Sequence, residues 1–102
     1  MAKKILIIED EAALRMALEE KFTREGFDVA VADNGEDGLA FAQEKHPDLI
    51  LLDIILPKMN GFDVLTHLAK DDITKNIDVM ILTNLSETGK VGDIVRKEVS
   101  DY

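Results

Sequence analysis

The chain has 102 residues, a length that suits one domain built around one hydrophobic core. Apolar residues make up 46% and charged residues 32%, a composition typical of a soluble globular protein and not of a disordered one. The 21 acidic side chains outnumber the 12 basic ones, and the net charge of -9 disfavours binding to nucleic acid. The chain has no cysteine, which excludes disulfides and thiolate chemistry. The first apolar run is too short for a signal or membrane-spanning segment, so we expect a cytoplasmic protein.

Four segments of the chain have the patterns of β-strands. Residues 5–8, 49–52 and 79–82 are uninterrupted apolar runs rich in branched side chains, which predicts strands buried on both faces. In residues 27–32, by contrast, larger apolar side chains alternate with small or polar ones. This alternation predicts a fourth, less buried strand at an edge of the sheet.

Helical patterns fill the gaps between these strands. Residues 14–22 carry apolar side chains four positions apart, which predicts a first helix that stops at Gly26. Asn34 is placed to cap a second helix, which ends at His46. Two more helices are predicted from their apolar residues: Phe62, Leu65, Leu68 and Ala69, and then Val91, Ile94, Val95 and Val99. Strands that alternate with helices predict an α/β fold, an open parallel sheet flanked by helices with right-handed crossovers.

Ligands of such sheets bind beyond the carboxyl ends of the strands, and acidic residues gather there. Glu9 and Asp10 follow the first strand, Asp53 follows the third, and Thr83 follows the fourth. Three neighbouring carboxylates would repel one another by roughly 3 kcal/mol per pair, at about 5 Å and an effective dielectric constant near 20. An oxygen-liganded divalent cation such as Mg²⁺ relieves this repulsion. A metal beside a carboxylate permits phosphoryl transfer, with the carboxylate as nucleophile and the Thr83 hydroxyl bonded to a phosphoryl oxygen.

A purely structural role is open for some of the same residues. Acidic side chains commonly cap helices, so Glu9 and Asp10 could serve only the helix that follows them. This alternative does not extend to Asp53, because residues 54–57 end in a proline and do not have the pattern of a helix start. Thr83 taken alone could be an ordinary strand residue.

Three segments, in this order, carry a family resemblance: KILIIEDE at 4–11, PDLILLDIILPKMNG at 47–61 and VMILT at 79–83. The most specific is the second, in which an apolar strand ends in Asp and is followed by a proline and a Met-x-Gly turn. With these segments the chain resembles the receiver domains of bacterial two-component response regulators, the CheY-like family, over its whole length. The resemblance implies a flavodoxin-like fold, in which the family's strand order is 2-1-3-4-5.

The resemblance also implies a role for each site residue. Asp53 matches the phosphoacceptor, and Glu9 and Asp10 match the acidic pair that holds Mg²⁺ together with Asp53 and the backbone carbonyl of Ile55. Thr83 matches the switch hydroxyl. The implied partner is a sensor histidine kinase or a phosphotransfer protein, and neither nucleic acid nor membrane is an expected partner. Such a domain catalyses its own phosphorylation and dephosphorylation and is not a conventional turnover enzyme.

The family pattern continues with a fifth strand, which carries a lysine, and a fifth helix. Tyr102 matches the aromatic switch position at the start of that strand, so we expect a single receiver domain at 1–102 with strand order 2-1-3-4 and the fifth unit missing or only begun. Asn84 stands where the family usually has a small residue. Because the family's lysine and final strand–helix unit are missing from the pattern, an alternative function is a non-signalling receiver fragment or scaffold that acts as an oligomerising or interaction module. In either case we expect a homo-oligomer formed through the incomplete edge at residues 79–82.

Overall fold

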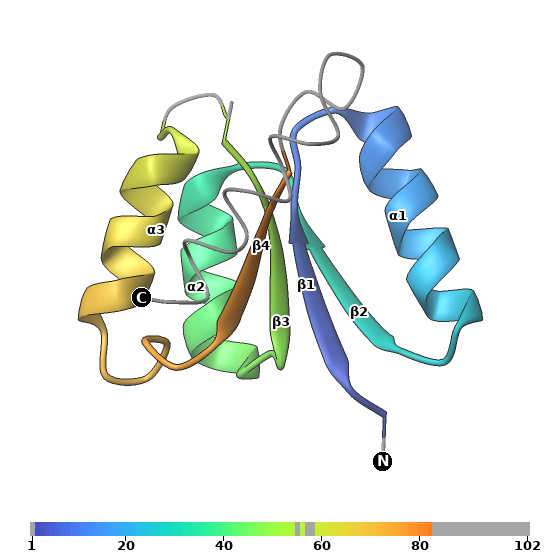
Figure 1. Cartoon of the computed structure of the whole chain (residues 1–102). Coiled ribbons are helices and arrows are strands. Elements are labelled where there is room, and N and C mark those ends of the chain that lie inside the picture. The colour runs from blue at the N-terminus through green and yellow to red at the C-terminus, as the bar shows by residue number, and fades with distance from the viewer. Residues whose placement is uncertain (1, 55, 57–58, 83–102) are drawn as a thin grey trace.

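The computed structural model of the chain describes residues 2–54, 56 and 59–82. The elements of this part, in chain order, are β1 (Lys4–Ile8), α1 (Ala12–Arg24), β2 (Asp28–Ala32), α2 (Gly35–Lys45), β3 (Leu49–Asp53), α3 (Gly61–Lys70) and β4 (Asp78–Leu82). The strands pair in parallel in the order β2-β1-β3-β4 (Figure 1). The expected α/β sheet and its strand order 2-1-3-4 are thus confirmed. The helix predicted from Val91 to Val99 lies outside the described residues.

The sheet is covered by helices on both faces, with α1 on one side and α2 and α3 on the other (Figure 1). Successive side chains of a strand point to opposite faces, so each central strand must be apolar at every position. In β1, Leu6 and Ile8 pack with side chains of α2 and α3, whereas Ile5 and Ile7 pack on the α1 side. All four are at most 2% exposed. The uninterrupted apolar runs are therefore strands buried on both faces, as predicted.

The edge strand β2 differs from the central ones in its burial. It pairs only with β1 among the described strands, and Val29 and Val31 are half-buried. Both pack against the core on the α1 side, together with Leu18 and Phe22 of α1. The alternating pattern in this segment thus correctly predicted a less buried edge strand.

The ends of the first two helices are set by the residues that the sequence pattern indicated. Gly26 follows α1 with a φ of 98°, a left-handed conformation that glycine adopts without strain. Asn34 caps α2, because its side chain accepts a hydrogen bond of 2.9 Å from the backbone N–H of Asp37. His46 ends α2 in the left-handed conformation, with a φ of 48°.

Helix α3 buries only part of the apolar set from which the sequence predicted it. Leu68 is buried and Leu65 is half-buried, whereas Phe62 is 56% exposed and Ala69 is exposed as well. The buried residues of α3 are Gly61, Val64 and Leu68. They form an i, i+3, i+7 stripe that shares Leu68 with the predicted set. None of the helices in the described part of the chain combines the length and apolarity that crossing a membrane requires.

Candidate functional site

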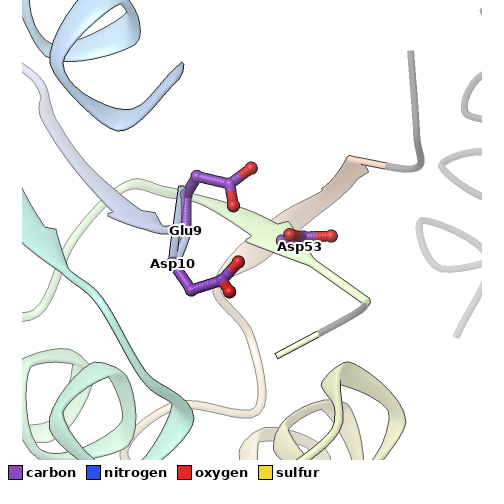
Figure 2. A group of neighbouring side chains, drawn as sticks. All are labelled: Glu9, Asp10 and Asp53. Carbon is purple, nitrogen blue, oxygen red and sulfur yellow. The ribbon is translucent and has the colours of Figure 1, made fainter. Parts of the chain in front are cut away.

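The carboxyl ends of β1 and β3 lie side by side, because the two strands pair in parallel with Ile8 opposite Leu52. Glu9 and Asp10 directly follow β1, and Asp53 is the last residue of β3. The side chains of these three residues converge at this edge of the sheet (Figure 2). One carboxylate oxygen from each lies within 4.8 Å of the other two. The structure therefore brings together the three acidic residues that the strand ends singled out.

The three carboxylates differ in their exposure to solvent. Glu9 is only 2% exposed, Asp53 is half-buried and Asp10 is exposed. The backbone N–H of Glu9 donates a hydrogen bond of 3.0 Å to the carbonyl oxygen of Ala32, which joins the end of β1 to the end of β2. The site therefore has a buried floor and an open side that a ligand can approach.

Burial and neighbouring acids change the ionisation of Glu9. Burial in the protein, together with a side-chain hydrogen bond to Asp53, raises the pKa of Glu9 from its ordinary value of 4.5 to about 8. The charge of Asp53 and a side-chain hydrogen bond to Asp10 act in the same direction, and the backbone N–H of Glu11 opposes them. At neutral pH the Glu9 side chain thus holds a proton when no cation is present.

Glu9 also contributes to the start of α1. Its Oε2 atom accepts a hydrogen bond of 3.1 Å from the backbone N–H of Glu11, the residue at the N-cap of this helix. The side chain of Glu11 itself makes no capping hydrogen bond. The capping role left open by the sequence is thus realised in part for Glu9. It does not account for the burial of this carboxyl group beside Asp53, which raises the energy of its charged form.

Gly61 holds the first turn of α3 against the end of β3, a role that the sequence pattern did not reveal. Its backbone N–H donates a hydrogen bond of 2.7 Å to the carbonyl oxygen of Ile54. A Cβ atom at this position would lie 2.4 Å from Cα of Ile54 and 2.7 Å from the carbonyl oxygen of Asp53. Only glycine permits this close approach. The signal that could have indicated it is a glycine immediately before a helical pattern and shortly after a predicted site residue.

Arg15 is a second residue that sequence reasoning missed. This half-buried arginine of α1 donates from its Nη1 atom to the backbone carbonyl oxygens of Glu9, at 3.0 Å, and Asp10, at 3.3 Å. The sequence did contain a signal for this contact, namely a lone basic residue one turn into the helix that follows the acidic pair.

The remaining predicted site residues lie outside the described part of the chain. These are Ile55, Thr83 and Tyr102. Their roles as a carbonyl ligand, a switch hydroxyl and a switch aromatic stay predictions.

Known proteins share both the sequence pattern and the fold. The pattern of the response regulator receiver domain matches residues 5–102. Transcriptional regulatory protein AfsQ1 of Streptomyces coelicolor is 44% identical over 79 residues, which cover 78% of this chain but only 34% of that protein. The chain thus corresponds to about a third of this relative's length.

Solved structures give the same family. The chemotaxis protein CheY4 of Vibrio cholerae superposes with a TM-score of 0.82 and 26% identity, over 97% of this chain and 81% of that one. The Mn(2+)-bound form of response regulator Rcp1 superposes with a TM-score of 0.74 and 28% identity, over 95% of this chain and 75% of that one. With the family pattern matched over nearly its whole length, the chain belongs to the response regulator receiver domains of two-component signalling.

Proposed function

We propose that this domain is a phosphoacceptor switch, which takes a phosphoryl group onto Asp53 in a Mg²⁺-dependent reaction. The observation that carries the proposal is the meeting of three carboxylates at the ends of two adjacent strands, one of them almost completely buried. A fold gains no stability from three such groups in contact unless a cation or a proton offsets their charge.

The three side chains fit a hard divalent cation. Oxygen atoms from Glu9, Asp10 and Asp53 lie close enough together to face one ion, and carboxylates with retained waters are the ligands that Mg²⁺ prefers. A cation bound here would favour the ionised form of Glu9, whose pKa is otherwise raised by burial and by the neighbouring acids. A structural relative, Rcp1, has a form that binds Mn(2+). When bound, the ion would supply positive charge to offset the charge on the phosphoryl oxygens.

The proposed reaction at Asp53 has two steps. An Asp53 carboxylate oxygen attacks the phosphorus of a phosphohistidine on the donor protein. The new O–P bond forms as the N–P bond breaks, and the imidazole nitrogen keeps the electron pair of that bond. Asp53 is half-buried at the end of β3, so it is held by the sheet and is still open to a donor. Water later attacks the same phosphorus, the bond between the Asp53 oxygen and phosphorus breaks, and inorganic phosphate leaves as the carboxylate is restored.

The partners in this proposal follow from the family and from the chemistry. The donor is a sensor histidine kinase or a phosphotransfer protein, and Thr83 is the hydroxyl that responds to the phosphoryl group. The domain is a switch and not a turnover enzyme, because the phosphoryl group is attached to the domain itself. The net charge of -9 disfavours direct binding to nucleic acid. The alternative, a non-signalling scaffold, gives no reason for the grouping of three acids.

Binding of a phosphoryl mimic tests the proposal. With Mg²⁺ present, beryllofluoride is expected to give a bound signal in ¹⁹F NMR, which chelator abolishes. Asp53→Asn removes the carboxylate oxygen that binds the mimic and should abolish the signal. Asp72→Asn is the matched control, because this exposed residue lies in the turn after α3 and pairs with Lys75. The proposal fails if wild type gives no bound signal with Mg²⁺, or if Asp53→Asn still gives one.

A further inference from the structure

We propose that Arg15 is a positioning residue, which holds the turn that carries Glu9 and Asp10 so that their carboxylates face Asp53. The inference deepens the proposed function and rests on it, since the orientation of this turn serves the binding of a cation at the three acids. The observation behind it is a single guanidinium nitrogen that donates to two successive carbonyl oxygens. The Nη1 atom lies 3.0 Å from the oxygen of Glu9 and 3.3 Å from that of Asp10.

The geometry of a helix explains why residue 15 reaches this turn. Arg15 lies in the first turn of α1, and its backbone N–H donates to the carbonyl oxygen of Glu11 at 2.9 Å. Side chains of a helix lean toward its N-terminus, so a long side chain at this position covers the residues that precede the helix. A guanidinium group has several N–H donors in a fixed plane, which suits it to bridge neighbouring carbonyl groups. Because the donor is charged, these hydrogen bonds are stronger than neutral ones.

The two bonds restrain the residues whose side chains make the site. The backbone of Glu9 is bonded on both sides. Its N–H donates to the carbonyl oxygen of Ala32 in β2, and its carbonyl oxygen accepts from Arg15 in α1. Asp10 is exposed, and the hydrogen bond from Arg15 to its carbonyl oxygen restrains its backbone. A peptide that is fixed at both residues directs their side chains toward the end of β3. Arg15 also brings a positive charge to a region with three carboxyl groups.

The affinity of the protein for Mg²⁺ tests this role. Arg15→Gln removes the charge and most of the donors, and is expected to weaken Mg²⁺ binding by about 10- to 100-fold, the usual effect of losing a group that orients metal ligands. Arg15→Lys keeps the charge and three N–H donors and is expected to restore most of the affinity. Arg24→Gln is the control for charge, because Arg24 is exposed at the other end of α1 and pairs with Glu20. It should bind Mg²⁺ as wild type does.

A second measurement separates positioning from general stability and does not need the ion. In chelator, the ¹³C NMR signals of the Glu9 and Asp10 carbonyl groups should shift in Arg15→Gln and stay in place in Arg24→Gln. Equal Mg²⁺ affinity of wild type and Arg15→Gln would overturn the inference, as would unshifted carbonyl signals. If Arg15→Gln does not fold, Arg15→Met takes its place in both measurements, because methionine keeps an unbranched side chain and has no N–H donor. If wild type binds no Mg²⁺, the proposed function fails, and the carbonyl signals alone then decide whether Arg15 holds the turn.

Discussion

Among single residues, Glu9 combines two properties that conflict in the absence of a cation. The residue is 2% exposed, and its carboxyl group accepts a hydrogen bond from the N–H of Glu11, which favours the charged form. Burial and the neighbouring Asp53 outweigh this bond and raise the pKa to about 8. The residue is therefore suited to alternate between a protonated state without metal and an ionised state with it.

The pH dependence of stability in chelator should report this state of Glu9. The pKa is raised on folding from 4.5 to about 8, so the folded state holds the proton more tightly than the unfolded state. The stability gained from this proton is complete below pH 4.5 and is lost as the pH rises through 8. Between pH 5 and 9, the unfolding free energy of wild type should fall relative to that of Glu9→Gln, by an amount on the order of a few kcal/mol.

Urea unfolding at a series of pH values measures this difference. Glu44→Gln, an exposed substitution on α2, is the control for the loss of one acidic group. Its pH profile should run parallel to that of wild type. A Glu9→Gln profile that also runs parallel to wild type would show that Glu9 titrates normally in the folded protein.

At the scale of the elements, the contact between α3 and the end of β3 connects the packing of a helix to the site. The first residue of α3, Gly61, touches the backbone of Asp53 and Ile54, with no space for a side chain. Any atom added there must move the start of the helix or the end of the strand. The position of Asp53 thus depends on a residue that takes no part in the chemistry.

Substitution of this glycine should damage the site as well as the fold. Gly61→Ala is expected to destabilise the domain by about 1–3 kcal/mol, the usual effect of adding an atom to a packed region. Because the displaced atoms belong to the backbone of Asp53 and Ile54, Mg²⁺ affinity should fall too. Chemical denaturation and a Mg²⁺ titration of the folded protein measure the two effects.

Leu68→Ala is the matched control for that experiment. Leu68 is a buried residue of α3, and its truncation should destabilise the domain by about 2–5 kcal/mol. It packs in the core between α3 and the sheet, about two helical turns from Gly61, so the folded variant should keep its Mg²⁺ affinity. If Gly61→Ala also keeps its affinity, the close contact does not position the site.

The elements were predicted more reliably from the sequence than the contacts between them. The strands and the grouping of Glu9, Asp10 and Asp53 follow from apolar runs and from the residues that end them, because burial on both faces leaves a continuous local pattern. The exposure of Phe62 was missed because Phe62 and Leu65 have the same three-residue spacing as the buried pair Gly61 and Val64. The contacts of Arg15 and Gly61 were missed because they depend on how a helix end lies against a loop, which no local pattern records.

In the molecule as a whole, the parallel sheet is the reason that distant acids meet. Residues 9 and 53 come together because β1 and β3 are neighbours in the order β2-β1-β3-β4, although a helix–strand–helix segment separates them in the chain. The same order puts β4 at one edge among the described strands. The expected assembly of copies through residues 79–82 stays a prediction. Assembly is a separate matter from the cation site, which lies at the ends of β1 and β3.

The central claim is that Glu9, Asp10 and Asp53 together bind Mg²⁺, and thermal unfolding with and without the ion tests it most directly. A ligand at 100 times its dissociation constant stabilises the fold by about 2.7 kcal/mol. Wild type should therefore melt at a clearly higher temperature in saturating Mg²⁺ than in chelator. Asp10→Asn removes a charged ligand at the open side of the site, and its melting temperature should barely respond to the ion. Equal melting temperatures of wild type in Mg²⁺ and in chelator would contradict the claim.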